Sequence, residues 1–293
     1  MSSSVDLFDQ EILQRYHLSI EEIKSAKGKR RVYLVRDAQD NSLKILKINL
    51  AFPLKLEREY QFLSTASSLK FTYLKTPQVY AYSTGMILME YLDCENYTRD
   101  TILDKNWSPQ ECKKWINALN EFQSIPTSSK GFTFYEIVKG ALYPVIRSLE
   151  IRKQIFRTLT FRELLTFTYF LIQYKLIRLF IKNVTTHYDF NTFNFTNLRG
   201  SDKMSLIDFE MGAYKGDSLY DLLYYISLPT TAIDNWTFQS ILLEEWTKMN
   251  KTPFQKIRIK VILCIISFQR IRRFEKEPLK AEIYRKNLRR LLE

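Results

Sequence analysis

Glycine and proline are scarce in this chain, with only 7 glycines and 8 prolines among its 293 residues. Proteins built mainly from turns and short strands use more of both residues, so a loop-rich β fold is not expected. Hydrophobic residues make up 45% of the chain. This content suffices for one large domain or for two unequal lobes with substantial cores.

Cysteine is also rare. Cys94, Cys112 and Cys264 lie far apart and form no C-x-x-C pair. This spacing favours a reduced, intracellular protein without a structural zinc site, in which the three thiols act as small, partly buried hydrophobic groups. Residues 1–10 are polar and acidic, without the apolar core of a signal peptide. We therefore expect a cytoplasmic protein.

Long hydrophobic runs are missing as well. The most apolar run, 161–182, is free of charge only between Glu163 and Lys175. A membrane-spanning helix needs about 20 apolar residues. We therefore expect no integral membrane protein and interpret 161–182 as a helix buried inside a lobe.

Acidic residues are outnumbered by basic ones. The chain has 44 Lys and Arg but 32 Asp and Glu, which gives a formal net charge of +12. A basic surface favours anionic partners such as nucleotide phosphate, nucleic acid or an acidic membrane face.

The N-terminal part combines short strand-like segments with two helical ones. Helices are predicted at 6–16 and at 54–68, where Leu56, Tyr60 and Leu63 share one stripe. Turns are predicted at 37–41 and at Thr84-Gly85. Strand-like segments predict strands at 20–23, 32–36, 43–48, 79–83 and 86–91.

The rest of the chain has a helical pattern. Ser108 caps a helix that has Pro109 at its first position and Glu111 three residues after the cap, and this helix is predicted to run to 124. Further helices are predicted at 137–157, 161–182, 235–249, 253–273 and 279–292. The sequence thus predicts an α+β fold, with a small β-rich lobe at 1–91 and a larger, mostly helical lobe at 92–293.

The most informative segment for function is 186–221. Asp189 is followed five residues later by Asn194, and Asp208 follows the apolar pair Leu206-Ile207. A carboxylate base with two oxygen ligands for Mg²⁺ recurs at this spacing in enzymes that transfer the terminal phosphoryl group of a nucleotide. We predict Asp189 as the catalytic base, and Asn194 and Asp208 as metal ligands.

Two residues of the same segment are predicted to support these groups. His187 is expected to brace the loop by hydrogen bonding rather than to act as acid or base. Asp221, in the element Gly216-Asp217…Asp221, is predicted to be a buried carboxylate that accepts backbone N–H groups of the loop.

A nucleotide-binding part is expected upstream. Lys47 lies on a predicted strand in the pattern Ile-Leu-Lys, and it is predicted to face the nucleotide, with Lys44 on the opposite face meeting solvent. Glu59 lies close to the apolar stripe of the helix at 54–68 and is preferred over Glu57 as the partner of Lys47.

Two other segments complete this part. Gly28 lies in the basic turn 27–31, at the place of a phosphate-covering loop. Glu90 and Tyr91 lie at the break between the lobes, where the backbone would contact an adenine.

Together these residues resemble the aminoglycoside phosphotransferase and choline kinase superfamily, a branch of the protein-kinase-like fold. The resemblance spans 27–223 and rests on four motifs: Arg58-Glu59-Tyr60, His187-Tyr188-Asp189…Asn194, Ile207-Asp208-Phe209-Glu210 and Gly216-Asp217…Asp221-Leu222. It implies ATP and Mg²⁺ as cofactors and a hydroxyl acceptor. Tyr188 departs from the usual motif, and no Ala-Pro-Glu segment follows Asp208, which disfavours a regulated protein kinase.

Three functions remain open at this point. The leading hypothesis is a small-molecule kinase, and the net charge favours a neutral or anionic acceptor, such as a sugar, an amino alcohol or a cell-envelope saccharide, over a polycationic aminoglycoside. The second is a pseudokinase that binds nucleotide without transfer.

The third hypothesis is a binder of nucleic acid or of a membrane surface. It would use basic residues of the C-terminal helices, among them Arg258 and Arg270. We expect no specific nucleic acid partner, because such charges usually form a solvated face, but peripheral contact with an anionic membrane at the inner face stays open.

Overall fold

The computed structural model describes most of the chain: residues 7–95, 108–126, 158–182, 184–187, 189–191, 193–209, 214–227, 236–250 and 254–293. Contacts divide the chain into two compact units. The first consists of Met1–Asn96, Asn117–Ile125 and Phe193–Ala213, and the second of Tyr97–Ile116, Pro126–Thr192 and Tyr214–Glu293.

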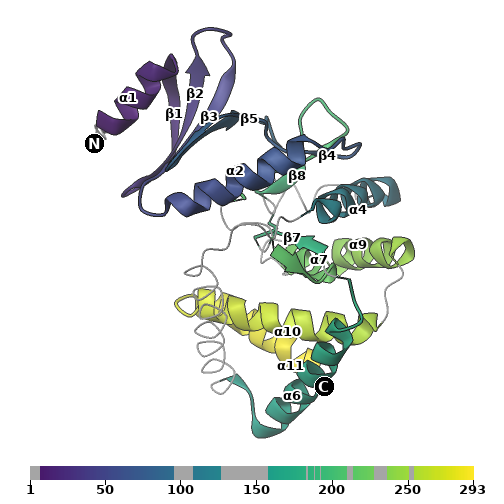
Figure 1. Cartoon of the computed structure of the whole chain (residues 1–293). Coiled ribbons are helices and arrows are strands. Elements are labelled where there is room, and N and C mark those ends of the chain that lie inside the picture. Colours follow the sequence, from purple (N-terminus) through teal and green to yellow (C-terminus); the bar gives the residue numbers. More distant parts are fainter. Residues whose placement is uncertain are drawn as a thin grey trace. The chain divides into compact units, whose positions relative to one another are not determined.

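The first unit is built on a five-stranded antiparallel sheet (Figure 1). Its strands, in spatial order, are β1 (Leu18–Lys27), β2 (Arg30–Asp37), β3 (Leu43–Asn49), β6 (Met86–Glu90) and β5 (Val79–Ser83). Helix α1 (Leu7–Arg15) contacts β1, and helix α2 (Pro53–Ser67) contacts β3, β5 and β6. Tyr33, Val35, Leu46 and Ile48 belong to one buried cluster of the sheet. The alternation of buried and half-buried residues along β2 from Tyr33 to Asp37 follows from the period of a strand.

A smaller three-stranded sheet belongs to the same unit. It consists of β4 (Leu74–Lys75), β9 (Met204–Leu206) and β8 (Phe195–Asn197), in that order. Glu121, in α4 (Pro109–Ser124), accepts the backbone N–H groups of Thr72, Tyr73 and Leu74 at 2.8–2.9 Å. A single carboxylate thus satisfies three N–H groups at the entry to β4.

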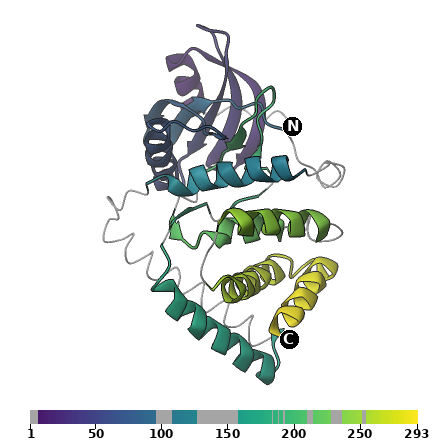
Figure 2. The same ribbon diagram turned by 90° about the vertical axis from the view of Figure 1, so that its right-hand side faces the viewer.

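The second unit is mostly helical (Figure 2). Its helices are α6 (Phe161–Arg178), α7 (Leu219–Ile226), α9 (Trp236–Met249), α10 (Gln255–Arg273) and α11 (Pro278–Leu292), and its two short strands are β7 (Val184–Thr186) and β10 (Tyr214–Gly216). Helix α10 contacts α6, α7 and α11. The core shared by α6, α10 and α11 contains Phe167, Cys264, Phe268, Tyr284 and Leu288.

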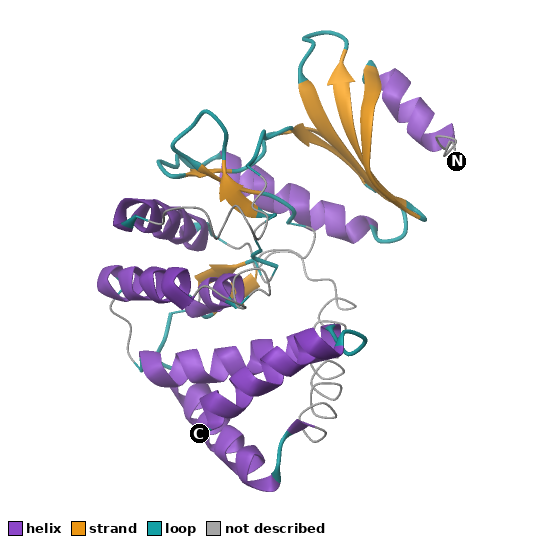
Figure 3. Cartoon of the chain, turned by 180° about the vertical axis from the view of Figure 1, so that it is seen from behind, coloured by secondary structure: helices purple, strands orange, loops and turns teal. Residues whose placement is uncertain are grey.

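The predicted α+β architecture is confirmed, with an antiparallel sheet in the N-terminal region and helices in the C-terminal region (Figure 3). The predicted helix at 137–157 lies outside the described residues. Two expectations about environment were wrong. Lys44 is buried and bonded to Asp37 across the β2–β3 hairpin rather than facing solvent. Helix α6 is buried on one face only.

The three cysteines are free. Burial raises the pKa of Cys112 to about 11 and that of Cys264 to about 12, so both thiols stay protonated near neutral pH. Of the helices in the described residues, none is long and apolar enough to span a bilayer.

Candidate active site

Lys47 occupies the middle of the sheet in the first unit. It pairs with Val32 on β2 and with Ile87 on β6, so the strand on each side fixes its backbone. Its side chain is nearly buried, and its Nζ lies 2.8 and 3.1 Å from the two carboxylate oxygens of Glu59. A buried ammonium needs such a partner, because an unpaired charge would cost several kcal/mol.

Glu59 lies on the face of α2 that is turned toward the sheet, and it is completely buried. Its Oε1 also accepts the backbone N–H of Phe209 at 3.2 Å. The same carboxylate therefore fixes both the lysine and the chain directly after Asp208.

Asp208 follows β9 and completes this cluster. Its Oδ1 lies 3.1 Å from Nζ of Lys47, and about one third of its side chain remains exposed. Its φ of 63° lies in the left-handed region, which is uncommon for a residue with a Cβ. The ring of Phe209 holds this backbone in place by stacking on Phe62 at 4.4 Å. Such maintained strain is frequent at functional sites.

Asn194 lies at the start of β8, opposite the end of β9. Phe195 pairs with Leu206, and the N–H of Ile207 donates to the carbonyl of Asn194 at 2.9 Å. The antiparallel register therefore places Asn194 and Asp208 at the same open end of the β8–β9 hairpin.

An amide and one carboxylate suit Mg²⁺, which prefers oxygen ligands and usually keeps positions for waters and substrate phosphates. The described residues contain no group of three or more His, Cys, Asp or Glu side chains that could hold a metal by themselves. The donor set at this hairpin thus fits a metal that binds together with a nucleotide, rather than a permanently enclosed ion.

The remaining residues predicted for nucleotide binding lie elsewhere in the first unit. Gly28 is in the β1–β2 turn with a φ of 58°, a backbone conformation that explains the glycine. Glu90 ends β6, where its side chain pairs with Lys75 at 2.8 Å and its N–H donates to the carbonyl of Gln78. Tyr91 follows it and is half-buried.

The second unit holds the His187–Asn191 part of the predicted catalytic segment. The backbone N–H of His187 donates to Oδ2 of Asp221 at 2.9 Å, and both residues are buried. The His187 ring packs edge-on against Phe190, whose ring in turn contacts Trp115 and Tyr225.

Asp189 contacts helix α7, the helix that carries Asp221. Its Oδ1 accepts a hydrogen bond from the hydroxyl of Tyr224 at 3.3 Å. Asp221, Tyr224 and Tyr225 lie three and four residues apart, so one face of α7 supports the loop at three points. Burial raises the pKa of Tyr224, so its hydroxyl keeps the proton that it donates.

Tyr224 was not recognised from the sequence as a site residue. Its position three residues after Asp221 was the available signal, because residues at this spacing share a helix face. The guanidinium of Arg270 lies over the Tyr224 ring, 4.3 Å from its centroid. Arg270 is buried, and among the described residues no group accepts from its Nε or Nη2.

Asp217 anchors the start of α7. It accepts the N–H of Leu219 at 2.9 Å and two bonds from the buried guanidinium of Arg258, at 2.5 and 3.2 Å. Arg258 and Arg270 were expected on a solvated basic face, and this was wrong, because both side chains are buried in the helical unit.

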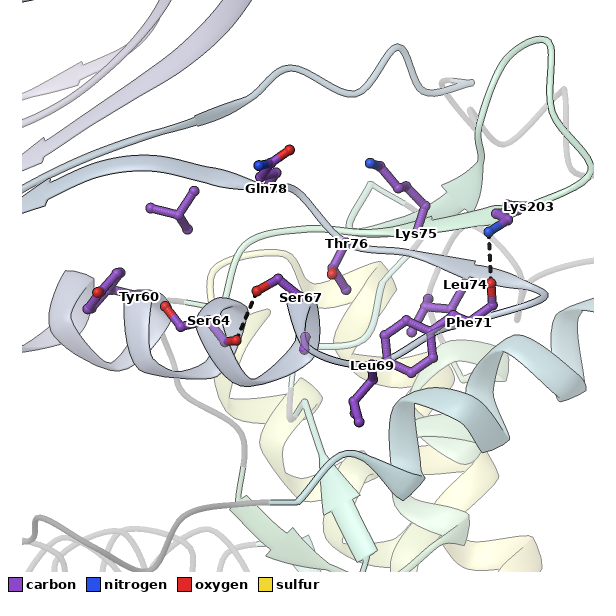
Figure 4. Close-up of a pocket in the computed structure, with 12 residues that line it drawn as sticks. Tyr60, Ser64, Ser67, Leu69, Phe71, Leu74, Lys75, Thr76, Gln78 and Lys203 are labelled. Atoms are coloured by element: carbon purple, nitrogen blue, oxygen red, sulfur yellow. Dashed lines mark hydrogen bonds between the residues drawn. The ribbon is translucent and has the colours of Figure 1, made fainter.

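A cavity of about 550 Å³ lies at the end of α2, apart from the cluster of Lys47, Glu59 and Asp208 (Figure 4). Tyr60, Ser64 and Ser67 line it from the helix, opposite Lys75 and Gln78. The side chains of Lys47, Glu59, Asn194 and Asp208 do not line this cavity. We therefore do not assign phosphoryl transfer to it.

Comparison with known proteins assigns the family. A model described as the phosphotransferase enzyme family, APH, matches residues 20–247 of this chain. A search of curated proteins gives no significant match.

Solved structures share the fold at low identity. The ternary complex of streptomycin, ATP and APH(2″)-IIa is 16% identical with a TM-score of 0.66, over 92% of this chain and 90% of that chain. Macrolide 2′-phosphotransferase from Brachybacterium faecium is 13% identical with a TM-score of 0.56, over 96% of each chain.

Choline kinase from Cryptosporidium parvum Iowa II is 12% identical with a TM-score of 0.56, over 97% of this chain and 90% of that chain. The chain therefore belongs to the phosphotransferase enzyme family and is an enzyme that transfers a phosphoryl group to an alcohol acceptor.

Proposed function

We propose that this phosphotransferase uses ATP and Mg²⁺ and acts on a hydroxyl group of a small molecule. The observation that carries the proposal is the placement of Lys47 within 3.1 Å of both Glu59 and Asp208. A lysine held in this way offers a fixed cation to nucleotide phosphates, and Asp208 and Asn194 offer oxygen ligands to the metal. Bound Mg²⁺ supplies charge neutralisation at the phosphate oxygens.

In this proposal the other residues position the reactants. Asp189 aligns the acceptor hydroxyl and takes its proton, while Tyr224, Asp221 and His187 keep its loop in place. The turn at Gly28 approaches the phosphates, and the backbone at Glu90 and Tyr91 contacts the adenine. The N–H of Glu90 already donates to the carbonyl of Gln78, so this N–H is not offered to the adenine.

We propose an acceptor that is not a polycation, such as a sugar, an amino alcohol or a cell-envelope saccharide. The net charge of +12 supports this class. The surroundings of Asp189 support this class as well. Its carboxylate accepts the hydroxyl of Tyr224, and the cations Arg270 and Arg273 lie near that tyrosine. Cations near the acceptor site would repel a polycationic substrate.

An acceptor panel with γ-³²P-labelled ATP and Mg²⁺ tests this proposal. We expect labelled product with members of the sugar, amino alcohol or saccharide groups, and little with polycationic aminoglycosides. Transfer only to aminoglycosides would overturn the acceptor class but keep the enzyme assignment. Nucleotide binding without turnover toward any acceptor or water would instead support a pseudokinase.

A further inference from the structure

The outer face of α6 is unusually apolar. On its inner face, the ring of Phe167 packs edge-on against that of Phe268 in the core with α10 and α11. On the outer face of α6 and at its C-terminal end, seven large apolar side chains are 55 to 78% exposed: Phe161, Leu165, Tyr169, Ile172, Leu176, Leu179 and Phe180. Monomeric proteins in water rarely leave so many large apolar side chains exposed along one helix.

These residues form one continuous stripe. From Phe161 to Leu179 they follow each other at intervals of three or four residues, which keeps them on one side of an α-helix. With a rise of about 1.5 Å per residue, the stripe is about 27 Å long. Isolated exposed apolar residues are common on protein surfaces, but a contiguous stripe of this length marks an interaction site.

Cations border the stripe, and carboxylates are absent from it. Arg162 and Lys175 are exposed and lie on its two sides at helical spacing, and Lys182 follows the helix end. The one acidic residue of α6, Glu163, lies on the opposite side. Its carboxylate is used in the capping box, where it accepts the N–H of Thr160 at 2.7 Å.

We propose that the outer face of α6 docks on the surface of an anionic phospholipid bilayer, with the stripe inserted at the headgroup level and the cations at the phosphates. An apolar helix face edged by Lys and Arg binds such an interface through both buried apolar area and charge. The net charge of +12 acts in the same direction.

A second copy of the chain fits this face less well. Symmetric pairing through α6 would bring the same cations, Arg162 and Lys175, of two copies near each other, with no carboxylate on the stripe to balance them. The membrane proposal concerns a surface of the second unit and does not depend on the proposed acceptor.

Vesicle flotation of the full chain tests the proposal. We expect binding to vesicles of phosphatidylcholine mixed with phosphatidylglycerol, and much weaker binding to phosphatidylcholine alone. The variant Leu165→Ser/Ile172→Ser/Leu176→Ser should lose at least about tenfold in affinity, because three inserted side chains are removed. Leu279→Ser is the matched control, because Leu279 is an exposed leucine outside the stripe, and it should bind like wild type.

Three outcomes would overturn the proposal: no binding of wild type to the anionic vesicles, equal binding by the triple variant, or a wild-type dimer that becomes monomeric in the triple variant by analytical ultracentrifugation. Circular dichroism checks that the variants are folded. If the triple variant unfolds, Arg162→Ala/Lys175→Ala decides the question, because docking requires that it lose the preference for phosphatidylglycerol.

Discussion

Replacing Asp189 with asparagine should lower the rate of phosphoryl transfer by about 10²–10⁴-fold, the usual contribution of a general base. Asparagine keeps the size of the side chain and can still accept the Tyr224 hydroxyl bond, but it cannot take the proton of the acceptor. Nucleotide affinity should stay near the wild-type value, because the proposed phosphate and metal ligands are unchanged. Single-turnover transfer and nucleotide titration measure the two quantities separately.

Tyr224→Phe provides the matched control for this result. It keeps the ring and the contact with Arg270 but removes the hydroxyl that donates to Asp189. The loss of one such hydrogen bond should reduce the rate by up to about tenfold. Wild-type transfer by Asp189→Asn would show that Asp189 is not the base.

Replacing Arg258 with methionine should have the largest effect on stability. The change leaves Asp217 buried after the loss of two hydrogen bonds from the guanidinium, and breaking a buried ion pair from one side costs about 3–5 kcal/mol. Chemical denaturation of the full chain, followed by circular dichroism, measures the loss in the free energy of unfolding.

The double variant Asp217→Asn/Arg258→Met removes both charges and should recover much of this loss, because neither charge of the buried pair is left without the other. Lys248→Met is the surface control. Its ammonium pairs with Glu244 and Glu245 but is more than half exposed, so it should change stability far less. If Arg258→Met lowers the free energy of unfolding as little as Lys248→Met does, the buried pair does not contribute the expected stability.

Longer elements were predictable from the sequence because their periodicity is strong. Helix α2, the long C-terminal helices and the other four strands of the antiparallel sheet were predicted near their observed bounds, whereas β1 extends beyond the predicted 20–23 at both ends. The strands β7, β8 and β10 were not predicted, since three residues are too few to show a period-2 pattern.

Side-chain environments were less predictable because they depend on pairing between distant residues. Lys44 is buried because β2 brings Asp37 to it, and strand alternation alone gave no sign of that partner. The apolar run of α6 led to the prediction of a buried helix, but the run alone did not show that one face stays exposed. The family motifs marked Glu59, Asp189, Asn194 and Asp208, and the strand pattern Ile-Leu-Lys marked Lys47. The catalytic roles of these five residues remain proposals.

A crystal structure with a non-hydrolysable ATP analogue and Mn²⁺ tests the central claim most directly. An anomalous difference peak should lie within bonding distance of Asp208 and of the side-chain oxygen of Asn194, with Nζ of Lys47 contacting the nucleotide phosphates. A nucleotide bound with its metal away from both residues, or with its phosphates beyond reach of Lys47, would contradict the claim.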